Sequence, residues 1–215
     1  MTNGTDSVFV AAYWPFFKTH EQRKFHYVAE DGSMSPFTSF FTYDLVTDSM
    51  LYNDYDENDA WKNCWFYQYR PGFVIAEWRD DYPQDNSYLA KTFGNVKKKV
   101  MSTPILWGDY VHIGQVVTNK PRVSLTGSTP PQMGFASQSV LFEQILPDMV
   151  VQGVTYQDVL QFVYQQQWGN EDAHGARYWM AKGVGPIALQ WVSPTPKTGS
   201  PLVTTARMLA TVTST

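Results

Sequence analysis

The acidic stretch NDYDEND, residues 53–59, contains oxygen-bearing side chains at a spacing that suits a hard cation. Asp54, Asp56 and Asn58 alternate along it, and carboxylate and amide oxygens are the ligands that calcium prefers. The glycine and the terminal glutamate of a calcium-hand loop are both missing. The pattern therefore predicts a solvated turn and no metal, with a surface calcium site at these three residues as the alternative.

A second group with chemical potential is EWRDDYP, residues 77–83, where carboxylates stand beside an arginine. In an extended strand Glu77 and Asp81 share one face, and paired carboxylates divide the acid and base work of glycoside hydrolysis. His112, in YVHIGQVV, is a candidate general base. If the protein is an enzyme, Glu77, Asp81 and His112 are the catalytic candidates. The simpler interpretation is an ion-paired strand end and, for His112, one polar position of an alternating strand.

The sequence lacks the GxSxG, Walker-loop, HExxH and paired CxxC motifs that mark common hydrolases, nucleotide sites and zinc sites. It gives no reason to expect a cofactor. Whether the protein catalyses any reaction stays open at this point.

Aromatic residues offer a different chemistry, which is ligand stacking. Phe, Trp and Tyr make up 16% of the 215 residues, while charged residues make up only 17%, which is low for a globular domain. Rings stack on the apolar faces of sugars, and neighbouring amides, carboxylates and guanidinium groups bind the hydroxyls. Segments such as WFYQYR, EWR, VYQQQW and RYW combine these groups. The candidate ligand-binding residues are Trp65, Tyr67, Trp78, Arg79, Trp168, Tyr178 and Trp179.

Charge and apolar runs exclude some classes of partner. The net charge is −4, with 16 basic and 20 acidic residues, so no broad basic field predicts nucleic-acid binding. Lys97–Lys99 form the one basic run, which is typical of a solvated strand face or a protected strand edge. No apolar run approaches the roughly 20 residues of a transmembrane segment.

The compartment is indicated by the cysteine count and the opening residues. The single Cys64 excludes an intramolecular disulfide and is expected to be a buried, unreactive thiol. The opening MTNGTDSVF lacks the basic and apolar regions of a signal peptide. We expect a secreted or periplasmic mature chain without its signal peptide, with a cytoplasmic protein as the alternative.

Short β-branched and aromatic segments between turn signals must position these groups. Residues 65–70 and 73–79 predict a hairpin across Pro71-Gly72. Residues 176–181 and 187–192 predict two strands joined by KGVGP, with Pro186 at a strand start or edge. Residues 154–168 fit either a strand or a helix, and their aromatic content favours a strand.

The fold class that follows is all-β and mostly antiparallel: a single curved sheet, a β-barrel or a β-sandwich of lipocalin-like form, with at most one short helix. Residues 1–7 are expected to be a flexible N-terminus and residues 8–192 the β domain. Residues 193–215 form a tail rich in Pro, Thr and Ser, with a last strand within LVTTARMLATV.

Two segments resemble a known family. GVTYQDVLQF and the later YWMAKGVGPIAL resemble the closing strands of small bacterial periplasmic lipoproteins, which end in a similar YWxAKGVG hairpin. YWPFFKTHEQRKFHYV, residues 13–28, is similar to their opening strand. The resemblance covers about a quarter of the chain, and Pro186 and the aromatic-rich middle depart from it. It implies a lipocalin-like curved antiparallel sheet and carries over no catalytic residue.

Three functions remain in competition. The first is a non-catalytic ligand-binding protein whose aromatic-rich groove binds a carbohydrate. The second is a polysaccharide-active enzyme, a lyase or hydrolase, that uses the same groove. The third is a lipocalin-like carrier of a small apolar ligand. The expected partner is a small molecule or a glycan, and the oligomeric state stays open.

Overall fold

The structure is a computed structural model, and it describes part of the chain. The backbone is described for residues 7–15, 22–29, 34–44, 49–55, 61–70, 72–80, 100–101, 105–120, 122–125, 132–168, 174–192 and 207–214. Side chains are described for residues 7–15, 22–28, 72, 108–120, 137–165, 167 and 176–190. The predicted strand face at Lys97–Lys99 lies outside these residues.

Strands dominate the described residues, and the only helical element among them is one 3-10 turn, η1 (Val10–Ala12). The strands are β1 (Ser7–Phe9), β2 (Arg23–Ala29), β3 (Met34–Asp44), β4 (Ser49–Tyr55), β5 (Trp61–Arg70), β6 (Phe73–Asp80), β7 (Val100–Met101), β8 (Ile105–Gly108), β9 (Tyr110–His112), β10 (Val116–Asn119), β11 (Arg122–Leu125), β12 (Gln132–Val151), β13 (Val154–Trp168), β14 (His174–Ala181), β15 (Gly185–Val192) and β16 (Arg207–Ser214). Because every pairing is antiparallel, the predicted all-β, antiparallel fold class is confirmed. No described helix is long and apolar enough to span a membrane.

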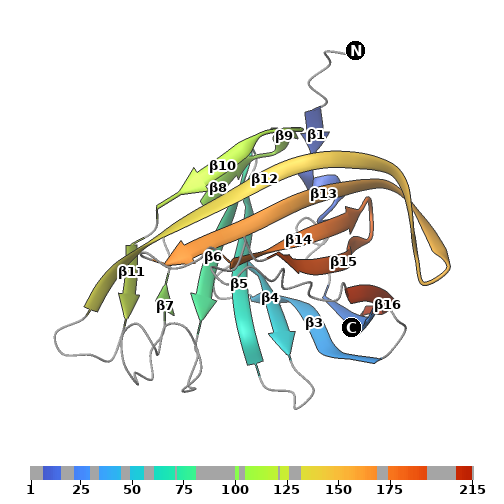
Figure 1. Ribbon diagram of the computed structural model, residues 1–215, viewed down its shortest axis with the longest axis horizontal. Coiled ribbons are helices and arrows are strands. Elements are labelled where there is room, and N and C mark those ends of the chain that lie inside the picture. Colours follow the sequence, from blue (N-terminus) through green and yellow to red (C-terminus); the bar gives the residue numbers. More distant parts are fainter. Residues whose placement is uncertain are drawn as a thin grey trace, which may run out of the picture.

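Two sheets contain all of these strands. β1 and β9 form a small pair, and the other fourteen form one large curved sheet (Figure 1). In the large sheet neighbours run from β10 through β12, β11, β7, β6, β5, β4, β3, β2, β16, β15 and β14 to β13, and β12 also pairs with β13. Some strand pairings are short: β7 pairs with β6 over two residues and with β11 over two residues. The β12–β13 ladder is much longer and continuous apart from one irregularity.

Both hairpins expected from the sequence are present. β5 and β6 pair from Arg70 and Phe73 outward, across the Pro71-Gly72 turn. β14 and β15 are joined by residues 182–184, and Gly183 and Gly185 both have positive φ, at 77° and 112°. Pro186 follows at the start of β15, where a missing N–H costs least, and a register shift comes directly after it.

The ambiguous segment 154–168 is a strand. β12 and β13 form a long hairpin whose two-residue turn consists of Gln152 and Gly153, both with positive φ. Two positive φ angles are what a type I′ turn requires, and this turn type matches the twist of the strands it joins. The strand expected within LVTTARMLATV is β16, which pairs with β2 and β15.

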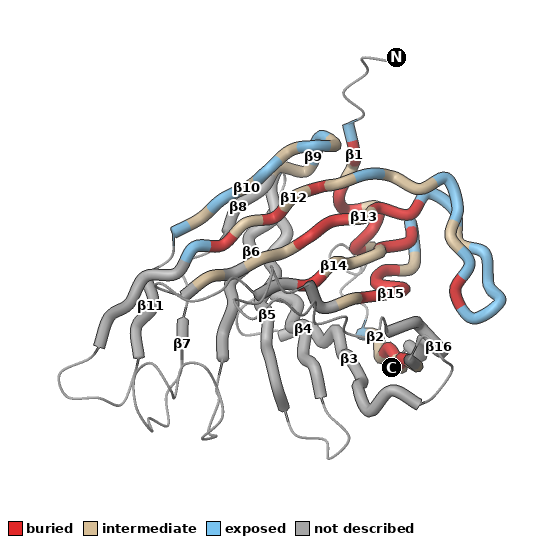
Figure 2. The backbone as a smooth tube through the Cα atoms, in the orientation of Figure 1, coloured by how far each residue is buried: buried red, intermediate tan, exposed pale blue. Residues whose placement is uncertain are grey.

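The core lies between the inner faces of β12–β15, β2 and the N-terminal residues 8–14 (Figure 2). Phe162 contacts three other rings of this core, with ring centroids 5.6 Å from Trp14, 6.0 Å from Phe142 and 5.1 Å from Tyr178. Many of the rings noted in the sequence therefore pack inside the molecule. The N-terminal segment is fixed by backbone bonds as well, since Gly183 N–H donates to the Ala12 carbonyl at 2.7 Å.

Candidate functional site

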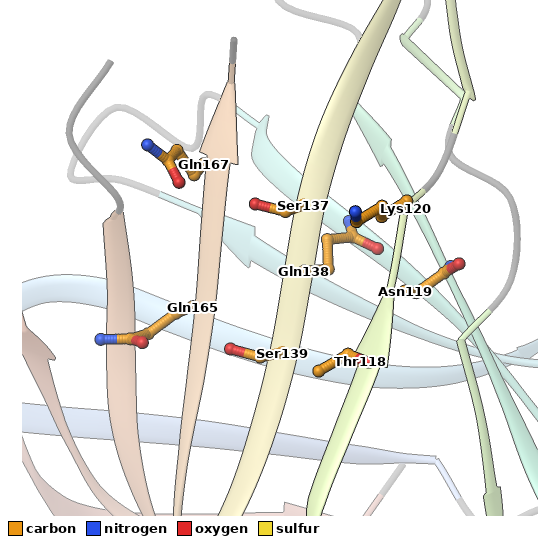
Figure 3. Close-up of a pocket in the computed structure, with 8 residues that line it drawn as sticks. All are labelled: Thr118, Asn119, Lys120, Ser137, Gln138, Ser139, Gln165 and Gln167. Atoms are coloured by element: carbon orange, nitrogen blue, oxygen red, sulfur yellow. The ribbon is translucent and has the colours of Figure 1, made fainter. Parts of the chain in front are cut away.

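A polar cleft of about 280 Å³ lies over three adjacent strands, β10, β12 and β13 (Figure 3). Every residue that lines it carries a hydroxyl, an amide or an ammonium group. The lining residues are Thr118, Asn119, Lys120, Ser137, Gln138, Ser139, Gln165 and Gln167. The cleft is a small open site whose walls can form hydrogen bonds in many directions.

The strand register explains why these residues meet. Ser139 of β12 pairs with Thr118 on one side and with Gln165 on the other, forming one polar row across three strands. Two positions along, Ser137 pairs with Gln167, and residues two apart on a strand share a face. Figure 3 shows the side chains of Ser137, Ser139, Gln165 and Gln167 pointing to the same side. Alternation of small and long polar residues thus creates the hollow.

Lys120 adds the only charge to this lining. It continues β10 one residue beyond Asn119, whose register partner is Gln138, and therefore lies beside Ser137. Its side chain is exposed, and we find no ion pair for it among the described residues. The eight lining residues include no carboxylate, imidazole or thiol.

Gln138 is the buried member of the cleft. It keeps only 2% of its surface exposed, so its amide lies out of contact with solvent. In Figure 3 its side chain points away from Ser137 and Ser139, into the molecule. Tyr164 lies nearby: burial raises the pKa of its phenol, and the neighbouring Gln138 amide opposes this only in part. Gln138 therefore marks the boundary between the polar cleft and the core.

A hydrogen-bonded network lies farther along β12 and β13 and extends to β14. The Arg177 guanidinium donates to both carboxylate oxygens of Glu143, with Nε–Oε2 at 2.8 Å and Nη2–Oε1 at 3.0 Å. Gln161 donates its amide to Glu143, and its own oxygen accepts bonds from Trp179 Nε1 at 2.9 Å and from Gln144 at 3.1 Å. Residues of β12, β13 and β14 are thus joined by side chains as well as by the ladder.

Glu143 is the extra residue of a β-bulge in β12. The register shifts between Phe142 and Gln144, and Gln161, which would lie opposite Glu143 in a regular ladder, lies opposite Gln144 instead. The Arg177 hydrogen bonds, then the Gln161 amide, hold the pKa of the Glu143 carboxyl below its usual range, against an opposing effect of burial. Glu143 raises the pKa of Arg177 in turn. The Glu143 carboxylate and the Arg177 guanidinium therefore form an ion pair with each other.

Two of the predicted ligand-binding residues have described side chains. Tyr178 is half-buried and stacks on Phe162 with an interplanar angle of 13°, so one face of its ring contacts the core. Trp179 is half-buried too, with its indole N–H committed to Gln161. Trp168 ends β13 opposite Ala136, beyond Gln167. None of the three lines the polar cleft.

The other predicted residues lie on the β5–β6 hairpin, of which the backbone is described. Trp65 is directly opposite Trp78, Tyr67 is opposite Ala76, and Arg79 is opposite Cys64. The register thus brings Trp65 and Trp78 together. In the order of the sheet this hairpin is separated from β14 by β4, β3, β2, β16 and β15.

Three of the catalytic and metal candidates lie in described strands. Glu77 is in β6 opposite Phe66, and His112 is exposed in β9, where its backbone N–H donates to Gln115 Oε1 at 2.9 Å. Asp81, Asp56 and Asn58 lie outside the described residues, and Asp54 is in β4. Across the described part of the chain, no three His, Cys, Asp or Glu residues gather in a way that could hold a metal.

Comparisons of the chain with protein-family models, with curated proteins and with solved structures found no match. The resemblance to small periplasmic lipoproteins therefore stays a prediction.

Proposed function

We propose that this protein is a non-catalytic binding protein and that the cleft over β10, β12 and β13 binds a carbohydrate. The observation that carries the proposal is the lining of the cleft, where hydroxyl and amide groups from three strands surround a hollow of about 280 Å³. Sugar hydroxyls both donate and accept hydrogen bonds, and Ser, Thr, Asn and Gln side chains do the same. The hollow is the size of a small ligand, close to the lower end of the usual range for binding pockets.

The two competing functions fit this cleft less well. An apolar carrier needs an enclosed apolar cavity, whereas this cleft is open and each of its eight lining side chains ends in a polar group, although much of the surface between those groups is carbon. A hydrolase or lyase needs titratable groups beside the substrate. The nearest described acid on this region, Glu143, is held by Arg177. The rings expected to stack on sugar are not part of the lining, so the proposal rests on hydrogen bonding.

The proposed site of action is outside the cytoplasm, in the periplasm or the extracellular medium. A single cysteine in a chain large enough to fold without disulfides is compatible with that setting. Fractionation of the native host, with antibody detection of this chain, decides between the secreted and the cytoplasmic alternatives.

Saccharide titrations followed by backbone amide NMR test the binding proposal. We expect a saccharide to shift the amide signals of β10, β12 and β13. The double variant Gln165→Ala/Gln167→Ala should bind about 30-fold more weakly, since each of the two lost hydrogen bonds contributes roughly 1 kcal/mol. Gln157→Ala is the matched control, because Gln157 is an exposed glutamine of the same strand outside the cleft. Equal losses in both variants, or shifts with fatty acids only, would reject the proposal, and new sugar products would make the protein an enzyme.

A further inference from the structure

We infer that the ligand of the cleft is an acidic sugar, whose carboxylate pairs with Lys120 while its hydroxyls contact the neighbouring serines and glutamines. This inference rests on the proposed function and adds the charge of the ligand. Its basis is the charge pattern of the cleft: one ammonium group enters the lining, and no lining residue carries a negative charge.

The other cations of this region already have partners. Arg177 forms a bidentate pair with Glu143, and Lys182 lies 3.3 Å from Asp158. Arg23 donates to the Val184 carbonyl at 2.7 Å. Lys120 differs from these three, because the part of the chain that the structure describes offers its ammonium group no carboxylate. A ligand carboxylate would complete this pairing.

Three described acids of the molecule are committed as well. Glu143 and Asp158 face their own cations, and Asp109 accepts the Gly72 N–H at 2.8 Å. The protein as a whole carries a net charge of −4, so its overall field repels anions. A preference for an acidic sugar must then come from the local charge of Lys120. A neutral sugar would leave that charge unused.

The size of the expected effect follows from the exposure of Lys120. An exposed ion pair contributes less than about 1 kcal/mol, and a direct charge-assisted hydrogen bond adds to it, so a preference of roughly 3- to 10-fold is expected. Salt screens such a pair, so the preference should shrink in about 0.5 M NaCl. Hydrogen bonds to the hydroxyls are less sensitive to salt.

The experiment compares D-glucuronate with D-glucose, which differ at one carbon, and uses acetate as a carboxylate without hydroxyls. Amide NMR titrations of the full chain give the three dissociation constants. We expect glucuronate to bind roughly 3- to 10-fold more tightly than glucose and far more tightly than acetate. Lys120→Gln should abolish the preference for glucuronate over glucose. Lys182→Gln, which removes an exposed lysine outside the cleft, should leave this preference unchanged.

Each outcome separates this inference from the proposed function. Equal affinity for glucuronate and glucose in the unmodified protein overturns the acidic-sugar inference and leaves carbohydrate binding in place. A preference for glucuronate that survives Lys120→Gln also overturns the inference, because a group other than Lys120 must then bind the carboxylate. Acetate binding as tight as glucuronate binding overturns the inference too, because the cleft would then bind a carboxylate without using the sugar hydroxyls. No binding of any sugar rejects the proposed function itself.

Discussion

Glu143 and Arg177 show how side chains on one face of a sheet join strands beyond their backbone ladder. Glu143 is the extra residue at the bulge of β12, and the alternation that turns Phe142 into the core turns Glu143 toward the face that carries Gln161. The bidentate pair and the Gln161 amide then satisfy the carboxylate from two strands. The result is a local brace across β12, β13 and β14, beside the polar cleft.

Removing the charge of Glu143 tests this brace. We expect Glu143→Gln to lower the free energy of unfolding by about 1–2 kcal/mol at pH 7, since it weakens charge-assisted bonds that are partly screened by water. Urea denaturation measures this change. Asp148→Asn, at an exposed position of the same strand, is the control and should change stability by less than about 0.5 kcal/mol.

The same pair predicts a dependence on pH. The folded protein holds the pKa of Glu143 below its unfolded value, so its contribution is present above the unfolded pKa of about 4.5 and is lost as pH falls through the folded pKa. The stability difference between the unmodified protein and Glu143→Gln should therefore vanish in strong acid. A difference that persists undiminished there would show that the carboxylate charge is not its origin.

Tyr164 predicts a loss of folding stability at alkaline pH. Burial, then the neighbouring Tyr178, raises the pKa of Tyr164 well above its ordinary value of 10.0. Its contribution to stability is then complete below pH 10 and is lost as pH rises through the folded pKa. We expect Tyr164→Phe to make the melting temperature less sensitive to pH between 9 and 11. Identical slopes for the two proteins in this range would contradict the assignment.

The aromatic residues show what could and could not be predicted from the sequence at this scale. The number of rings indicated either a core or a binding surface. The alternation of residues along a strand could not decide which face of the strand packs in the core and which faces a ligand. Tyr178 contacts the core because the sheet curves around Phe162 and Trp14, and that curvature comes from distant parts of the chain. The sequence VYQQQW predicts hydrogen-bonding groups for a ligand at its glutamines, but the strand partners Ser137, Ser139 and Thr118 depend on register, which no local pattern specifies.

Among the elements, the β12–β13 hairpin is the longest pairing and carries most of the candidate site. Its turn has Gln152 at φ 49° and Gly153 at φ 78°. A non-glycine residue with positive φ is uncommon, and Asn tolerates this conformation better than Gln. The turn thus retains a small strain at its first position.

Changing the turn residues should alter stability in opposite directions. Gln152→Asn gives the favoured Asn-Gly sequence and should raise the free energy of unfolding by about 0.5 kcal/mol. Gly153→Ala should lower it by about 1 kcal/mol, although its added carbon meets open space, because the positive φ disfavours alanine. Chemical denaturation of the two variants measures both changes. A loss on Gln152→Asn would contradict the type I′ assignment.

The hairpins were the elements best predicted from sequence. Pro71-Gly72 and KGVGP lie between β-rich segments, and both turns formed where these residues stand. Residues 154–168 stayed ambiguous because a helix and a strand bury similar numbers of apolar residues there. Pairing with β12 along the whole segment decides in favour of a strand. This pairing cannot be predicted from the residues of the segment alone, because β12 is a separate part of the chain.

At the scale of the whole molecule, the N-terminal residues are part of the core. Trp14 is 3% exposed and packs on Phe162, and Val10 donates its N–H to the Asp109 carbonyl at 2.8 Å. Residues 7–15 therefore connect β9, the β14–β15 turn and the centre of the large sheet. They act as an internal support.

Truncating Trp14 tests this role. We expect Trp14→Ala to lower the free energy of unfolding by about 3–5 kcal/mol, the usual loss for a large buried ring. Tyr110→Ala is a suitable control, because Tyr110 is an aromatic residue with 61% of its surface exposed, and its loss should be below about 1 kcal/mol. Thermal and urea unfolding measure both. A loss below 1 kcal/mol for Trp14→Ala would place the segment outside the folded core.

The pairing of β2 with β16 has a consequence for biosynthesis. β2 is among the first strands to leave the ribosome and β16 is the last one described, yet Val28 and Met208 are partners in one ladder. Until β16 emerges, β2 can pair with β3 and has an open edge on its other side. Domains fold as units during synthesis, so this sheet is completed only after nearly all of the described chain has been translated. The nascent chain must keep that edge from pairing with other chains for the whole of this interval.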